Sequence, residues 1–281
     1  MSFTGYFFNI DNWSVPGFLA VMVLFVSYLI FFDTRKLQKL AFGLSLILIY
    51  LALGSPLAKL TSFGLHSIVM LQHIILLMIT PILLLKALPN SLLQSSWLVS
   101  VLNKVKNTYL LLWLLGAVAM WGGHFFSAAL LSAKTGTAIC GINATAGSWV
   151  TAMPSGLSFA LLVIAGLLFY LPVFNPLDSG RLAPLKRVVY LFTACVSCST
   201  LGLYVVFSAN SAAAVEAIPI FNTLRNPLPM SLRNDQELAG MLMWVPGCIL
   251  YVMESVNILL KWYDGETAEE STVAAVKISK D

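Results

Sequence analysis

The sequence contains few charged residues and few of the side chains on which enzymes depend. Only 10% of its 281 residues are Asp, Glu, Lys or Arg, whereas soluble domains usually carry about 25%. Hydrophobic residues make up 59% of the chain, and the mean hydropathy is +0.87. This balance argues against an ordinary soluble domain. It predicts an integral membrane protein whose first partner is the lipid bilayer.

Sequence motifs of the common enzyme classes are also missing. The chain has no P-loop, no nucleophile elbow, no H-E-x-x-H and no Rossmann glycine pattern. Its acidic residues do not form a pair suited to general acid–base chemistry, and no paired broken helices suggest a transporter. The net charge of +4 comes from scattered basic residues, which is not typical of nucleic-acid binding. The sequence therefore predicts a membrane protein that is not an enzyme and binds no nucleic acid.

Long apolar runs dominate what is present. A hydrocarbon core about 30 Å thick requires roughly 20 apolar residues per helix. Seven runs meet this need, and Pro81 is expected to kink or end the third: 16–33, 38–56, 62–86, 108–131, 155–176, 185–208 and 236–260. The expected fold class is an all-α bundle of about seven transmembrane helices within residues 1–262. Residues 263–281 are polar and acidic and are expected to form a disordered cytoplasmic tail.

The basic residues predict the orientation of the bundle. Twelve lie on one side of the alternating runs, namely Arg35, Lys36, Lys39, Lys86, Lys104, Lys106, Arg181, Lys186, Arg187, Lys261, Lys277 and Lys280. Four lie on the other side, namely Lys59, Lys134, Arg225 and Arg233. The positive-inside rule then places the N-terminus outside and the C-terminus in the cytoplasm. The start of the chain has no basic region of a cleavable signal, so the first run is expected to be retained.

All three histidines are predicted to lie in the outer half of the membrane. His66 and His73 are seven residues apart on the third run, so they share a helix face with Met70, and His73 lies about 10 Å deeper. His124 falls in the outer half of the fourth run, one turn after Met120. The last run begins outside with Asp235, followed by Met241 and Met243.

Imidazole and thioether groups together suit soft or borderline metals, copper above all. We therefore interpret His66, Met70, His73 and His124 as candidate copper ligands, supported by Asp235, Met241, Met243 and Met120. Two other interpretations use the same residues. The histidines could form hydrogen bonds between helices while the methionines fill the core. Alternatively, His73 and His124 could hold a haem iron axially from facing helices, without covalent attachment because no C-x-x-C-H occurs.

The sequence does not assign a function to the cysteines. Cys195 and Cys198 lie one turn apart near the middle of the sixth run, where they could hold a soft metal but more simply pack as small apolar residues. Cys140 lies in an outer loop. No disulfide is proposed for it, and its loss is expected to change copper binding little.

The clearest local motif is NDQELAGMLMWVPG, residues 234–247. Asp235 stands where it could cap the first turn of its own helix. Gly240 and Gly247 lie seven residues apart on one face with Gln236, so another helix should approach there closely.

DQELAGMLMWVPG resembles the last-helix signature of the multi-pass CtaG family, and MLQHIILLMITPILLL, residues 70–85, is similar to that family's histidine-bearing helix. The resemblance covers most of the chain and agrees with the seven-helix count. It implies an assembly factor for haem–copper cytochrome c oxidases in the bacterial inner membrane. Such a factor would deliver copper to oxidase subunits or another membrane copper protein.

The chain departs from that family's pattern in two places. The family has a histidine three residues before its Gln-His pair, where this chain has Val69, and a Glu-His pair near the fifth helix, whereas no histidine follows His124 here. The resemblance thus carries over only to His73 and Asp235, with His66 and His124 as stand-ins. The predicted function is copper capture at an outward-facing His/Met site and transfer to an oxidase subunit. The alternatives are a non-catalytic structural subunit or scaffold of a membrane oxidase or copper enzyme, and a haem-binding protein.

Overall fold

A computed structural model describes residues 3–136, 138–144, 155–212 and 231–278. Apart from a single bridged turn at Ile139–Ile142, the regular structure in these ranges is helical. The longer helices are α2 (Val15–Phe31), α3 (Lys36–Leu53), α5 (His66–His73), α6 (Thr80–Lys86), α7 (Ser96–Lys104), α8 (Tyr109–Thr135), α10 (Ser155–Phe174), α11 (Pro184–Ala212) and α13 (Leu232–Ile278). Shorter ones are α1 (Phe3–Phe7), α4 (Pro56–Leu60) and a π-helix, η3 (Ile74–Ile79), which joins α5 to α6.

Within the described ranges, six helical segments are long and apolar enough to cross a membrane. They are Lys36–Leu60, His66–Lys86, Tyr109–Ala133, Gly156–Phe174, Pro184–Ser208 and Arg233–Gly265, and they coincide with the second to seventh predicted runs. The all-helical membrane fold is therefore confirmed. The first predicted run corresponds to α2, whose 17 residues extend about 26 Å, so its crossing stays a prediction.

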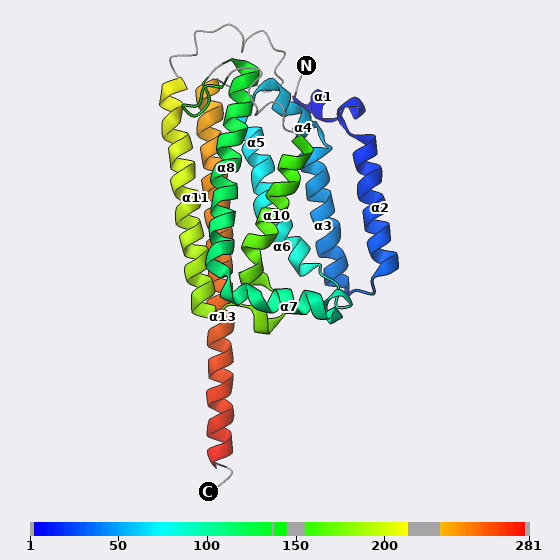
Figure 1. Cartoon of the computed structure of the whole chain (residues 1–281), viewed down its shortest axis with the longest axis vertical. Helices are drawn as coiled ribbons and strands as arrows, with labels where there is room; N and C mark the ends of the chain where they lie inside the picture. The colour runs from blue at the N-terminus through cyan, green and yellow to red at the C-terminus, as the bar shows by residue number, and fades with distance from the viewer. Residues whose placement is uncertain (1–2, 137, 145–154, 213–230, 279–281) are drawn as a thin grey trace.

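The third span, α5–η3–α6, forms the centre of the bundle. In the most apolar 18-residue stretch of this span, 78% of the residues are buried, whereas 22–39% are buried in the corresponding stretches of the other spans. Figure 1 shows α2 at one edge of the bundle and α11 at the other, with α5 and α6 between them. Polar groups on this central helix must therefore find partners inside the protein.

The central helix is irregular after His73. The N–H of Thr80 donates to the carbonyl of Ile75, five residues back, at the end of η3. Pro81 has no N–H to donate to Leu77, which frees that carbonyl. Gly166 of α10 packs there, since a Cβ on this glycine would lie 2.4 Å from the Leu77 oxygen. Pro81 was expected to kink or end this helix. The structure instead has a π-helical segment there, which lets α10 cross the central helix closely.

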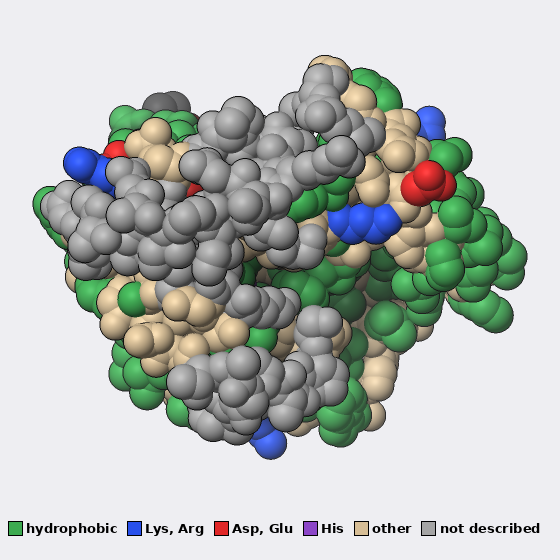
Figure 2. All heavy atoms as spheres, turned by 90° about the horizontal axis from the view of Figure 1, so that it is seen from above, with side chains coloured by type: hydrophobic (Ala, Val, Ile, Leu, Met, Phe, Trp, Pro, Cys, Tyr) green, Lys and Arg blue, Asp and Glu red, His purple; other side chains and the backbone are tan. Residues whose placement is uncertain are grey.

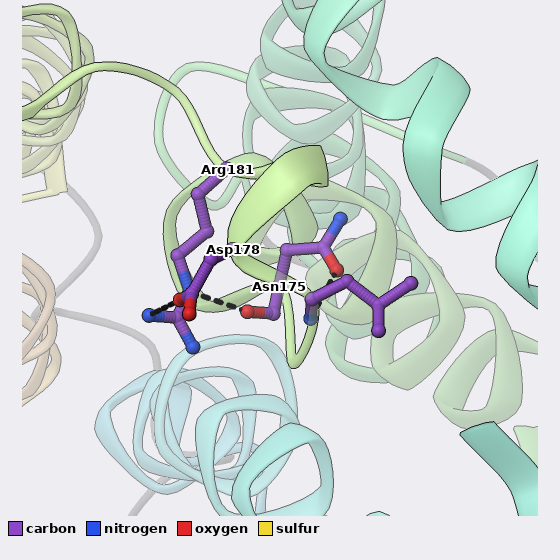
Figure 3. Close-up of polar contacts among 4 residues, drawn as sticks. Asn175, Asp178 and Arg181 are labelled. Carbon is purple, nitrogen blue, oxygen red and sulfur yellow. Dashed lines mark hydrogen bonds and ion pairs between the residues drawn. The ribbon is translucent and has the colours of Figure 1, made fainter.

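At the opposite end from α1 and α4, α7 runs across the bundle (Figure 1). Leu102 on α7 is buried whereas Trp97 is exposed, a pattern typical of an interfacial helix. The buried Asn175 fixes the turn between α10 and α11 here: its amide donates to the Leu102 carbonyl at 2.9 Å. Arg181 donates to the Asn175 carbonyl at 2.5 Å and pairs with Asp178 at 2.6 Å (Figure 3).

Helices α11 and α13 approach until their backbones touch. A Cβ on Gly240 would lie 2.6 Å from the carbonyl oxygen of Gly202, and one on Gly247 would lie 2.9 Å from the sulfur of Cys198. This confirms the prediction that the Gly240–Gly247 face admits a close neighbour.

Asp235 connects α13 to the central helix. Its carboxylate accepts from the backbone N–H groups of His66 at 2.6 Å and Ser67 at 3.1 Å, and from the Ser67 hydroxyl at 2.5 Å. The prediction that Asp235 caps its own helix is wrong. Ser231 occupies that place, since its hydroxyl accepts from the N–H of Asn234 at 3.2 Å. Asp235 instead caps the third span, because packing brings the two helix starts together.

The structure continues α13 as helix through residues 263–278. The disorder and the cytoplasmic position expected for residues 263–281 stay predictions. The stretch ETAEESTVAAVKI is rich in Ala and Glu, which favour helix once a preceding turn exists.

Figure 1 shows α1 at one end of the bundle and the end of α13 beyond the other. Which end faces the cytoplasm stays a prediction from the basic residues. Of the residues used for it, Arg225 and Lys280 lie outside the described residues.

The Asp235→Asn variant should unfold at a lower temperature. An amide keeps one acceptor oxygen and loses the charge, and a hydrogen bond to a buried charged group contributes about 2 kcal/mol. The measurement is the thermal midpoint in detergent. The matched control is Glu237→Gln on the same turn, whose partly exposed pair with Arg233 should contribute less than about 1 kcal/mol. Equal shifts for both variants would contradict the capping role.

The Gly240→Ala variant should weaken the packing of α11 on α13. The added methyl would contact the Gly202 carbonyl and the Val206 side chain, both at 2.6 Å, and such overpacking costs about 1–3 kcal/mol. Gly265→Ala on the same helix is the control, because its Cβ would meet nothing within 4 Å. That change should be neutral or stabilising, so a thermal midpoint lowered more by Gly265→Ala than by Gly240→Ala would refute this packing.

Candidate metal centre

Three side chains with metal-binding atoms converge at the end of the bundle where α1 and α4 lie. His66 is the first residue of α5, His124 lies on α8, and Cys140 lies in the turn that follows α8. The helix start that carries His66 is held by Asp235, so the position of this imidazole depends on α13.

A tight turn presents Cys140. The backbones of Ile139 and Ile142 exchange two hydrogen bonds of 3.0 and 2.9 Å. Between them, Cys140 and Gly141 both have positive φ, 51° and 74°, as a type I′ turn requires. The hydroxyl of Tyr204 on α11 donates to the Cys140 carbonyl at 3.0 Å. A non-glycine residue held in this left-handed conformation is uncommon, and such positions occur often at functional sites.

The three donor groups are close together and buried. The Cys140 sulfur lies 3.9 Å from Nε2 of His66. The rings of His66 and His124 meet edge to face, with 5.2 Å between their centroids. One ligand atom from each residue lies within 4.8 Å of the other two, and exposure is 0%, 0% and 1%. This spacing is compatible with three ligands around one ion after small side-chain movements.

The two imidazoles lack the hydrogen bonds that buried polar groups normally make. Among the described residues, Nδ1 of His66 and both ring nitrogens of His124 have no partner. Buried polar atoms without a partner are rare, and each calls for an explanation such as an ion or a water molecule. The unpaired nitrogens therefore favour a ligand-binding role over interhelical hydrogen bonding for these two histidines.

The thiol of Cys140 lies outside the membrane-spanning segments. Burial raises its pKa to about 11, a hydrogen bond with Ser208 lowers it, and the charge of Asp235 raises it. The thiol therefore keeps its proton at neutral pH, and a metal ion would have to displace that proton to bind sulfur.

His73 and Met70, the other two predicted ligands, are buried on the same helix. Met70 is fully buried one turn below His66, near the two histidines of the cluster. Nδ1 of His73 contacts the carbonyl oxygen of Val69 at 2.8 Å, and this ring does not belong to the converging group. His73 instead lines an open cavity of about 720 Å³ with Gln72, Ser127 and many apolar residues. The cavity's lining does not include His124.

The supporting residues are spread over the bundle. Met120 lines a small internal space with Met78 and Tyr170. Met243 is buried between α11 and α13, whereas Met241 is 52% exposed on the outer surface of the bundle. No histidine is visible on the described surface at this end of the molecule (Figure 2), in agreement with the burial of all three.

Sequence reasoning missed Cys140 as a member of the cluster. The available signal was its position in the loop directly after the helix that carries His124, on the same predicted side of the membrane. Sequence could not show that a bridged turn directs the thiol toward His66.

Comparison with known proteins gives one match. A family model described as cytochrome c oxidase caa3 assembly factor (Caa3_CtaG) matches residues 32–265. No curated protein and no solved structure matches the chain. The matched range contains all six long apolar segments and the three converging residues. Because the match covers most of the chain, this membrane protein belongs to the Caa3_CtaG family of cytochrome c oxidase assembly factors.

Proposed function

We propose that this chain assists cytochrome c oxidase assembly by binding a copper ion between His66, His124 and Cys140 and passing it to an oxidase subunit. The observation that carries the proposal is the convergence of three buried donor groups whose imidazole nitrogens lack other partners. The family supplies the oxidase as the partner. The copper ion is cargo in this role, and the protein performs no catalysis.

The donor set favours copper over harder metals. Two imidazoles and one sulfur are borderline and soft donors, which suit copper and zinc, whereas magnesium and calcium prefer oxygen ligands. Asp235 is the nearby acid, but its carboxylate is engaged with the start of α5. Met70 adds a thioether below the histidines, a donor that suits copper better than zinc.

Three protein ligands suit transfer better than storage. A site with three ligands can accept a fourth from a partner, so copper can move by ligand exchange without a free intermediate. If the bundle has the predicted orientation in a bacterial cell membrane, the site faces outward, near the first turns of α5 and α13.

The proposal predicts which substitutions abolish copper binding. The purified full-length protein, reduced and loaded with copper in detergent, is compared with His66→Ala, His124→Ala and Cys140→Ser by metal analysis. Each variant should weaken binding at this site at least about 100-fold, since even outer-shell partners of metal ligands contribute 10–100-fold. His73→Ala distinguishes the two ligand sets, because the sequence predicts loss of copper and the converging geometry predicts retention.

The visible spectrum of the same samples tests the alternatives. A Soret band lost in His73→Ala would support the haem reading and contradict ours. Copper content unchanged in all three cluster variants would also refute the proposal. That result would leave a structural role in oxidase assembly. Stable co-purification of the protein with oxidase subunits would support such a role.

A further inference from the structure

A second group of sulfur-bearing side chains lies where α11 and α13 pack side by side, far from the histidines. The Cys195 sulfur on α11 lies 2.8 Å from the Cys248 sulfur on α13. The hydroxyl of Ser199 lies 3.1 Å from the same Cys248 sulfur. Both cysteines are free thiols and partly buried. The partner of Cys195 is therefore on the neighbouring helix, not Cys198 in the same CVSC sequence.

Two further sulfur atoms lie beside Gly247, the residue before Cys248. Cys198 is fully buried, and its thiol donates to the Met243 carbonyl at 2.9 Å. A Cβ on Gly247 would lie 2.9 Å from the Cys198 sulfur and 3.7 Å from the Met78 sulfur. Gly247 thus keeps a thiol and a thioether on one side of the pair, within an otherwise apolar core.

The pair is separate from the histidine cluster. Cys248 follows Asp235 by thirteen residues on α13, which places it about 20 Å further along the helix. Both cysteines lie near the middle of their spans, Pro184–Ser208 and Arg233–Gly265. Neither is fully buried, so the pair faces the side of the bundle.

We propose that Cys195 and Cys248 form a second metal site that binds copper(I) at mid-membrane. Thiolate sulfur is a soft donor that selects copper(I). Zinc normally requires four ligands. The Cys198 thiol is engaged with the Met243 carbonyl, which leaves two thiols and the Ser199 hydroxyl among the described side chains in contact at the pair. Binding replaces one S–H proton at each cysteine with a bond to copper, so two protons leave and no electron is transferred.

The surroundings suit such a complex. Two thiolates and one copper(I) ion carry one net negative charge. The Ser199 hydroxyl donates to the Cys195 carbonyl at 2.8 Å and lies 3.1 Å from the Cys248 sulfur, so a turn of its O–H toward that sulfur would compensate part of the charge. An ion between the sulfurs requires them to separate to about 4.6 Å, twice a metal–sulfur bond of about 2.3 Å. Rotation of the partly exposed Cys195 side chain can provide this movement.

The test uses full-length protein purified anaerobically in detergent and loaded with copper(I) as its acetonitrile complex. Bound copper is measured after removal of the excess, in the wild-type and His66→Ala/His124→Ala backgrounds. Cys195→Ser/Cys248→Ser should lose one bound copper relative to its parent in both backgrounds. X-ray absorption of the histidine double variant should show sulfur ligands to copper. Loss in both backgrounds supports this site whether or not the histidine cluster binds copper.

Cys198→Ser is the matched control, since this thiol lies one turn from Cys195 but donates to a backbone carbonyl. It should retain the copper, and the thermal midpoints should show that every variant is folded. Unchanged copper in Cys195→Ser/Cys248→Ser would overturn the proposal. The proposal would also be overturned if the anaerobic protein had two fewer free thiols than its sequence contains and a reductant restored them. The two sulfurs would then be bonded to each other.

Discussion

The hydrogen bonds from the start of α5 to Asp235 are the contact on which the arrangement of the site depends. The first N–H groups of a helix have no partner within it, and inside a bilayer no bulk water replaces one. A carboxylate from another helix satisfies two of them here and carries the charge that a helix N-terminus favours. Because the first of these N–H groups belongs to His66, the same contact fixes one candidate ligand.

Cys140, a second candidate ligand, depends on the same helix through a different contact. Tyr204 of α11 holds the turn of Cys140, and α11 is held against α13 by the contact of Gly202 with Gly240. α13 therefore positions His66 directly and Cys140 through α11. The motif at the start of the last span therefore acts by positioning, since Asp235 and Gly240, five residues apart along α13, hold different parts of the same candidate cluster.

Much of the fold followed from the sequence, because the length and apolarity of a membrane span are local properties. Six spans, the close approach at Gly240 and the irregularity near Pro81 were predictable for this reason. The site was less predictable. Helical periodicity gives the depth and face of a residue but not which helix faces it, so the partner of Asp235, the approach of Cys140 to His66 and the pairing of Cys195 with Cys248 could not be derived.

The three ligands of the proposed site differ in how freely they can move. His66 and His124 belong to spanning helices whose displacement would disturb the packed core, whereas Cys140 belongs to a short turn beyond the end of α8. That turn holds Cys140 at a positive φ, a conformation that costs a non-glycine residue free energy, so release of the thiol is opposed less than movement of a helix. Its buried thiol also regains its proton readily once the metal leaves, because its pKa is about 11. In the proposed site, Cys140 would therefore be the ligand that exchanges first with a partner subunit, and the two imidazoles would hold the ion.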